Sequence, residues 1–323
     1  MIYLWILCGA AALLLLAVFL CFWLTFYVRR TKFDPDVYPL PAGKTYEPYH
    51  PQMLEGMKAF RTMPHQVFTI KSEDGLILSG RYFEYAPGAP MELMFHGYRG
   101  TAERDLGAGI ERAFALGHNA LIVDQRTTGG SGGRLVTFGI REHRDCLKWV
   151  EFCEAHFGPE IDLYLTGISM GASTVLMAAG EPLPPNVKGV LADCGFTSAS
   201  AIIKSVCHML HLPGNLIYPM VRLGGRLFGG FDLEAYSALE AVKKCRIPVI
   251  FFHGESDNFV PCYMSRENYE ACAAPKAILI VPGAGHGLSY LAGPETYLKT
   301  LRCFWYPETR ENFSEVSGDF CKS

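Results

Sequence analysis

The chain has 323 residues and a formal net charge of -3, with 50% hydrophobic and 19% charged residues. This balance is typical of a globular protein that buries a large core, and it excludes a disordered or fibrous chain. The sequence shows no basic tail, zinc-finger spacing or interleaved aromatic and basic residues, so nucleic acid is not an expected partner.

An uncharged apolar segment opens the chain. Residues 2–28 contain no charged side chain and exceed the roughly 20 residues that cross the hydrocarbon core of a bilayer. They lack the basic start and small-residue cleavage site of a signal peptide, so we expect a transmembrane helix that is not cleaved. Arg29, Arg30 and Lys32 follow it and nothing basic precedes it, which predicts a single-pass membrane protein with the rest of the chain in the cytoplasm. The odd number of cysteines beyond the helix agrees with reduced thiols.

Residues 29–64 are rich in proline and aromatic residues, with one helical stretch beginning near Pro51, and are interpreted as a stem. The main domain is predicted over residues 65–323. It opens with two strand-like runs around an Asp74-Gly75 turn, a pattern typical of an antiparallel hairpin.

From residue 91, apolar strand-like runs alternate with amphipathic helical runs, which predicts a parallel sheet. The fold class is therefore α/β, with an eight-stranded, mostly parallel, doubly wound sheet. Its six later strands are expected at 91–95, 120–123, 163–166, 187–192, 248–252 and 277–281. Residues 198–230 interrupt the alternation with an apolar, helical stretch free of acidic residues, which is interpreted as a lid.

The sequence Gly167-Ile168-Ser169-Met170-Gly171 lies between a predicted strand and a helical run, the context of a nucleophile elbow. Its glycines relieve crowding at the sharp turn, so that Ser169 projects above the sheet. The backbone amide of Met170, at a helix N-terminus, is predicted to stabilise a developing oxyanion. Many such motifs are structural turns, so the interpretation depends on partner residues.

A serine nucleophile of this kind needs an acid and then a histidine on later strand ends. Asp257 and His286 each come directly after one of the last two predicted strands. We therefore predict a triad in which His286 is the general base for Ser169 and Asp257 orients the imidazole. Asp193 and Glu255 are the rival acids, and each member alone has an alternative as a turn or capping residue.

The loop after the predicted strand 91–95 reads His96-Gly97-Tyr98-Arg99-Gly100. In this context the second oxyanion donor is expected from such a loop, and we assign it to the Tyr98 amide. His96, Gly97 and Arg99 are predicted to border the substrate. The alternative is a plain strand-to-helix turn whose glycines serve geometry only.

Two further features do not indicate a cofactor or a metal. The glycine-rich loop after Asp124 lacks the residues of a P-loop or a dinucleotide site and is interpreted as structural. His208 and His211 lie three residues apart on a helical stretch, but no carboxylate or thiolate set joins them. We therefore predict neither a metal nor a cofactor.

Six motifs carry a family resemblance: His96-Gly97, Asp124-Gln125-Arg126 with its glycine loop, 167–171, 192–198, 253–257 and 283–286. With them, residues 65–297 resemble the α/β-hydrolase superfamily, and more narrowly membrane-tethered bacterial hydrolases of the serine-aminopeptidase-like branch. Esterases, lipases, thioesterases, acyltransferases and peptidases share these motifs, so the resemblance fixes no substrate. The elbow lacks the tryptophan typical of proline-specific peptidases, and a serine nucleophile argues against dehalogenase or epoxide-hydrolase chemistry.

The predicted function is hydrolysis of a carboxylic ester through an acyl-enzyme. The lid is apolar, free of acidic residues and basic through Lys204, Arg222 and Arg226. Together with the membrane anchor, it suggests a lipid or long-chain ester delivered from an anionic bilayer surface. The alternative is a lid that only packs over the pocket. A membrane-anchored serine peptidase and a catalytically silent scaffold are the other functions left open.

Overall fold

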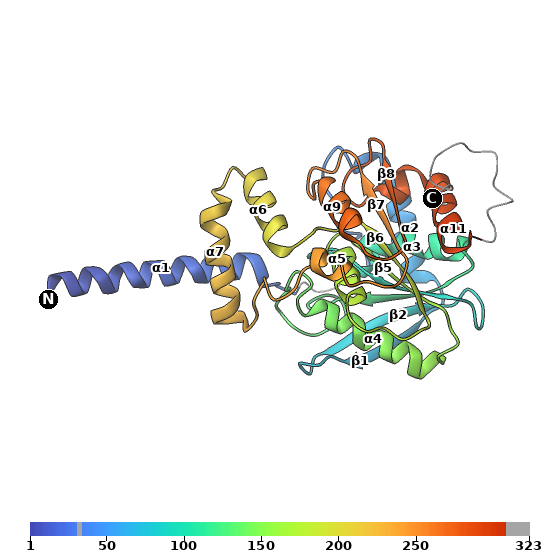
Figure 1. The fold of residues 1–323 in the computed structure, drawn as a ribbon, viewed down its shortest axis with the longest axis horizontal. Coiled ribbons are helices and arrows are strands. Elements are labelled where there is room, and N and C mark those ends of the chain that lie inside the picture. The colour runs from blue at the N-terminus through green and yellow to red at the C-terminus, as the bar shows by residue number, and fades with distance from the viewer. Residues whose placement is uncertain (31–33, 308–323) are drawn as a thin grey trace.

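The computed structural model describes residues 1–30 and 34–307. Lys32 of the basic flank, Cys321 and the end of the predicted domain at residue 323 lie outside the described residues. A layered α/β domain forms the larger body, and the long helix α1 (Ile2–Phe26) projects from it past helix α7 (Gly214–Gly224) (Figure 1).

One sheet of eight strands forms the centre of the domain, in the order β1-β2-β4-β3-β5-β6-β7-β8. The strands β1 and β2 pair antiparallel, as do β2 and β4, whereas the other neighbours pair parallel. This confirms the predicted eight-stranded, mostly parallel sheet. The strands are β1 (Gln66–Lys71), β2 (Ile77–Phe83), β3 (Met91–Phe95), β4 (Asn119–Asp124), β5 (Leu163–Ile168), β6 (Val187–Asp193), β7 (Val249–Gly254) and β8 (Lys276–Val281).

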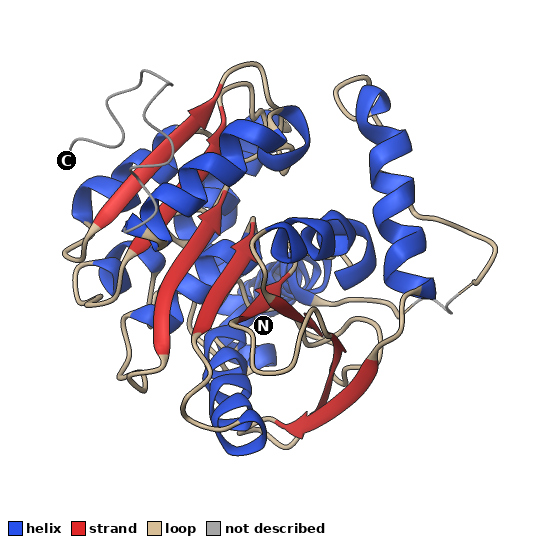
Figure 2. Ribbon diagram, turned by 90° about the vertical axis from the view of Figure 1, so that its right-hand side faces the viewer, coloured by secondary structure: helices blue, strands red, loops and turns tan. Residues whose placement is uncertain are grey.

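Helices cover both faces of the sheet (Figure 2), which is why its central strands read as nearly continuous apolar runs. Buried residues of α4, α5 and α8 pack on one face, and those of α2 and α3 pack on the other. The helices are η1 (Glu47–Tyr49), α2 (His50–Thr62), α3 (Ala102–Ala115), α4 (Glu142–Phe157), α5 (Met170–Ala179), α6 (Ala199–Met209), η2 (Gly225–Gly229), α8 (Ala238–Val242), α9 (Tyr263–Ala271), α10 (Ser289–Ala292) and α11 (Pro294–Trp305).

The helix α1 is the one helix among residues 1–30 and 34–307 that is long and apolar enough to cross a membrane. It ends two residues before the uncharged segment does, because Tyr27 turns extended and pairs with Leu135 as an isolated β-bridge. The Val28 amide donates a hydrogen bond to the Arg134 carbonyl at 2.8 Å. The chain is thus joined to the domain immediately after the helix.

The apolar stretch predicted as a lid, residues 198–230, consists of α6, α7 and the π-helical turn η2, inserted between β6 and β7. It packs on the end of α1, where Phe22 and Phe26 belong to the same buried cluster as Val221. The two helices approach closely at Gly224, because a Cβ there would lie 2.7 Å from the Cβ of Phe22. This contact between the insertion and α1 was not predicted from the sequence.

The two arginines of this insertion are paired with carboxylates. Arg222 forms ion pairs with Asp232 at 2.8 Å and with Glu234 at 2.5 Å, and Arg226 also pairs with Asp232. These two acids follow directly after the stretch that the sequence marks as acid-free. Local carboxylates thus engage both arginines of the predicted basic surface, whereas Lys204 lies over the Tyr218 ring, with its Nζ 5.1 Å from the ring centroid.

Candidate active site

The predicted elbow is a sharp turn between β5 and α5. Ser169 is the N-cap of α5 and has a φ of 57° and a ψ of -120°, a backbone conformation that side chains rarely adopt. Its amide donates to the Asp193 carbonyl at 2.8 Å. The flanking glycines permit this turn, because a Cβ on Gly167 would lie 2.1 Å from the Gly171 carbonyl oxygen, and one on Gly171 would lie 2.0 Å from that of Phe95.

We expect Gly171→Ala to lower the free energy of unfolding by about 3 kcal/mol or more, because the new methyl collides with backbone of β3 that cannot move alone. Thermal unfolding of the detergent-solubilised chain measures the effect. Gly109→Ala is the matched control, since its methyl meets the flexible Met94 side chain at 3.2 Å inside a helix. Equal melting temperatures for the two variants would contradict the steric argument.

The structure brings Ser169, His286 and Asp257 together. The Ser169 Oγ lies 3.0 Å from the His286 Nε2, and the His286 Nδ1 lies 2.7 Å from an Asp257 carboxylate oxygen. The other Asp257 oxygen accepts the amides of Phe259 at 2.8 Å and Val260 at 2.9 Å. These contacts fix the carboxylate, and they orient the imidazole with Nε2 facing the serine hydroxyl.

His253 is a partner of Asp257 that the sequence interpretation missed. Its Nε2 lies 3.2 Å from Asp257 Oδ2, and its Nδ1 lies 2.7 Å from the Ser265 hydroxyl. Burial raises the pKa of Asp257, but the hydrogen bonds with His253 and His286 outweigh it and hold this pKa well below its ordinary range. His253 precedes the acid by four residues in the same motif, 253–257, and this spacing is the sequence signal that could have indicated a contact between them.

The rival acids are engaged elsewhere. Asp193 is buried and accepts hydrogen bonds from Ser289 at 2.7 Å and Tyr297 at 3.2 Å, and burial raises its pKa. Glu255 accepts the Gly283 amide at 3.4 Å. Among the described residues, the acid hydrogen-bonded to the His286 ring is Asp257, which favours it over both rivals.

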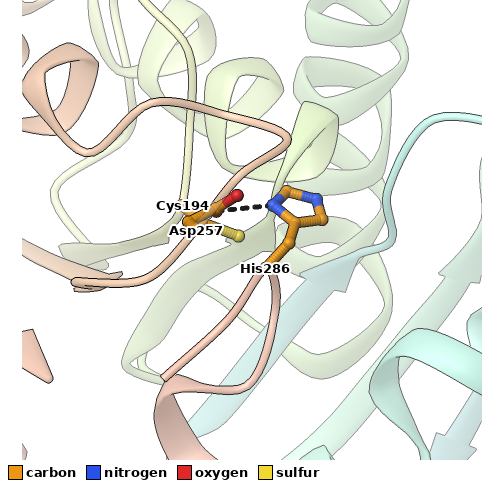
Figure 3. A group of neighbouring side chains, drawn as sticks. All are labelled: Cys194, Asp257 and His286. Carbon is orange, nitrogen blue, oxygen red and sulfur yellow. Dashed lines mark hydrogen bonds and ion pairs between the residues drawn. The ribbon is translucent and has the colours of Figure 1, made fainter. Parts of the chain in front are cut away.

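Cys194 lies beside this pair, so that its sulfur, an Asp257 oxygen and a His286 nitrogen lie within 4.8 Å of one another (Figure 3). Burial raises the pKa of the Cys194 thiol well above its usual value, which keeps it protonated. A metal needs the thiolate and would have to replace the hydrogen bond between His286 and Asp257. The arrangement fits a hydrogen-bonded acid and base better than a metal site.

The loop after β3 contacts the elbow and is held from two sides. The Gly97 amide donates to Asp105 of α3 at 2.9 Å, and a Cβ on Gly97 would lie 3.3 Å from that of Ser169. The Tyr98 hydroxyl donates to the Thr25 carbonyl of α1 at 2.7 Å. The amide of Met170 lies in the first turn of α5, where helix N–H groups have no partner within the helix. The Tyr98 and Met170 amides as an oxyanion hole stay a prediction.

His96 and Arg99 are placed differently from the expectation that they border the substrate. His96 is buried, with its Nε2 accepting the Gln125 amide at 3.0 Å. The Arg99 guanidinium donates to the carbonyls of Leu24 at 2.8 Å and Tyr27 at 2.9 Å, because the last carbonyls of a helix lack partners and attract cations. Of this loop, Gly97 and Tyr98 line the cavity.

A cavity of about 580 Å³ opens beside Ser169 and His286. Its apolar lining includes Met53, Leu106, Leu191, Phe259 and Leu291. The segment interpreted as a stem also contributes, through Pro41, Ala42, Thr45 and Tyr46. This segment is therefore part of the candidate site, which its proline and aromatic composition did not indicate.

No family model matches the chain. It is 28% identical to the uncharacterized protein YqkD of Bacillus subtilis over 251 residues, which cover 76% of this chain and 81% of that protein. It is 26% identical to the uncharacterized protein Rv2307c of Mycobacterium tuberculosis over 280 residues, or 85% of this chain and 86% of that protein. These relatives carry no assigned activity.

Solved structures with similar folds include an esterase, Pf2001 of Pyrococcus furiosus, with a TM-score of 0.64 and 20% identity over 87% of this chain and 97% of that one. The α/β hydrolase GrgF of Penicillium has a TM-score of 0.59 and 19% identity, over 76% of this chain and 99% of its own. Est1E of Butyrivibrio proteoclasticus, solved with ferulic acid, has a TM-score of 0.57 and 19% identity, over 75% and 99%. Together with the sheet order and the elbow, these likenesses show that the chain has the fold of the α/β-hydrolase superfamily.

Proposed function

We propose that the protein is a serine hydrolase that cleaves carboxylic esters through an acyl-enzyme. The observation that carries the proposal is the hydrogen-bonded series from Asp257 through His286 to Ser169, with steps of 2.7 and 3.0 Å at the carboxyl end of a parallel sheet. A serine hydroxyl is a weak nucleophile at neutral pH, and an adjacent base oriented by a third group is what activates it.

In the proposed reaction, Ser169 Oγ attacks the ester carbonyl while His286 Nε2 takes its proton. The oxyanion that forms accepts hydrogen bonds from the amides of Met170 and Tyr98. His286 then protonates the leaving alcohol, which departs and leaves the acyl group on Ser169. Water, deprotonated by His286, releases the acid and restores the serine. The chemistry requires no cofactor.

The lining of the cavity supports an ester with an apolar acyl group as the substrate. Its volume of about 580 Å³ falls within the range of sites that enclose small organic ligands. We further propose that α1 spans a membrane once with the domain in the cytoplasm, since Arg29 and Arg30 follow the uncharged segment directly. The name of the similar structure Pf2001, an esterase, agrees with an ester as the substrate.

Labelling with a fluorophosphonate tests the nucleophile directly. We expect one adduct on Ser169, because the reagent phosphonylates a serine that an adjacent histidine activates. Mass spectrometry of tryptic peptides from the full-length, detergent-solubilised chain identifies the modified residue. A folded protein whose Ser169 stays unmodified, or whose adduct lies on another serine, would overturn the proposal.

A further inference from the structure

The side of α7 and η2 that faces away from the domain is apolar. Leu216, Leu223, Leu227 and Phe228 are 70%, 42%, 57% and 39% exposed, respectively, and we call them the outer leucine face. Leu216, Leu223 and Leu227 are spaced by seven and four residues, which places them on one side of a helix. The opposite side, with Tyr218, Val221 and Gly224, is buried. Such a helix is apolar on the side that faces away from the protein as well as on the side that packs.

This face lies at a defined level of α1. Gly224 crosses α1 at Val18 and Phe22, because a Cβ on Gly224 would lie 3.0 Å from the Val18 carbonyl oxygen and 2.7 Å from the Phe22 Cβ. The Phe228 ring lies 5.3 Å from that of Phe19 and 5.5 Å from that of Phe22. The level of crossing is thus residues 18–22, and α7 runs across the axis of α1 (Figure 1).

The first charged residues after α1 place that level inside the bilayer. Residues 2–16 are exposed. The segment 2–28 holds no charged side chain, so if α1 crosses the membrane, the polar boundary on the side of the domain lies near Arg29. Residues 18–22 precede Arg29 by about 10 Å or more, at about 1.5 Å per helical residue. That part of α1 would therefore lie in hydrocarbon, and it is the part on which α7 and η2 pack.

We propose that the outer leucine face lies in the acyl-chain edge of the leaflet from which α1 emerges into the domain, so that the partner of this surface is the bilayer itself. The proposal rests on the proposed spanning of the membrane by α1. A helix that lies across a transmembrane helix runs along the membrane plane, as interfacial amphipathic helices do. The charge of Arg222 does not oppose this placement, because Asp232 and Glu234 pair with it.

The placement gives an apolar substrate a short route. Met209, at the end of α6, is 44% exposed and also lines the cavity that contains Ser169. A lipid chain that leaves the bilayer beside α6 and α7 would therefore reach the cavity without crossing water. This deepens the proposed function by naming the source of the ester as the same leaflet.

Photolabelling by lipid tests the surface without any need for catalysis. The full-length chain is reconstituted in phosphatidylcholine vesicles that contain a phosphatidylcholine with a diazirine in its acyl chain, irradiated and analysed by peptide mass spectrometry. We expect adducts on α1 and on residues 214–229, and none around Val67, which is 59% exposed on β1 at the edge of the sheet. Adducts confined to α1, or the absence of adducts from the whole chain, would overturn the proposal.

Two variants sharpen the result. Leu216→Glu and Leu227→Glu should each lower labelling of residues 214–229 at least about fivefold, because a carboxylate in hydrocarbon is costly. Labelling of α1 should stay as it is in both, which shows that the chain is still inserted. Val67→Glu, an equal change on β1, should leave both signals unaltered; an equal loss in this control would contradict the proposal. Fluorophosphonate labelling of Ser169 in the same samples reports separately on the proposed hydrolase.

Discussion

Replacing Ser169 with alanine should lower kcat/KM for ester hydrolysis by about 10⁴–10⁶-fold, with the fold intact. The loss is large because the acyl-enzyme cannot form, and the oxyanion donors and substrate binding alone leave only a residual acceleration over water. The substitution removes one hydroxyl from a residue that is 6% exposed, so the packing of the elbow is retained. Initial rates with p-nitrophenyl esters, corrected for spontaneous hydrolysis, give the measurement.

Ser173→Ala is the matched control for this variant. Ser173 lies on the same helix, and its hydroxyl bonds the backbone of Phe196 at 2.8 and 2.9 Å rather than the imidazole. We expect a loss of about 1 kcal/mol in the free energy of unfolding and a kcat within a few fold of the parent. A Ser169→Ala protein that keeps most of its activity would show that another group is the nucleophile.

Replacing Asp257 with asparagine should lower kcat by about 10⁴-fold, as an orienting acid does in triads of this kind. The carboxylate accepts the His286 Nδ1 proton at 2.7 Å, and an amide can present a donor there, which favours the tautomer that cannot accept the serine proton. KM should change little, because the carboxylate lies behind the imidazole. Steady-state kinetics near pH 8 separate the two constants.

Asp193→Asn is the informative comparison, since this acid is equally buried but hydrogen-bonds to Ser289 and Tyr297. Its loss of kcat should be smaller by at least about 100-fold. If Asp193→Asn proves the more damaging of the two, the acid is wrongly assigned.

The lowered pKa of Asp257 means that its carboxylate stabilises the folded state above about pH 4 and that this contribution is lost as the pH falls further. Near pH 8 this contribution is fully present, so kinetic measurements there report on catalysis and not on unfolding.

Much of the fold could be predicted because its signals are local. The mostly apolar sequence of β5 (Leu163–Ile168) indicates a buried strand, and the glycines at 167 and 171 indicate a sharp turn with close backbone contacts. The serine, the acid and the histidine each follow the end of a predicted parallel strand. Because parallel strands end at the same edge of a sheet, this order predicted that the three side chains lie close together. The structure accordingly brings Ser169 and His286 within 3.0 Å although they are 117 residues apart in the sequence.

What could not be predicted depends on contacts between distant segments. No local pattern shows that Thr45 and Tyr46 line the cavity, because their proline-rich surroundings have no periodicity. Arg99 was expected at the substrate since its loop is there, but the free carbonyls at the end of α1 bind its guanidinium. The pairing of Arg222 with Asp232 was also missed, because Asp232 lies just beyond the end of the apolar stretch 198–230, and its approach to Arg222 depends on how the chain turns there.

The bonds between α1 and the loop after β3 have a consequence for how such a protein would meet its substrate. Tyr98 and Arg99 hydrogen-bond to carbonyls in the last turn of the helix, and Tyr27 pairs with Leu135, so these described residues join α1 directly to the domain. With α1 in a bilayer, Ser169 would stay at a constant distance from the membrane surface and could not move out into the aqueous phase. The protein would then encounter an ester by lateral diffusion in the plane of the membrane. The rate of turnover would depend on the amount of ester per unit of membrane area rather than on the bulk concentration of ester.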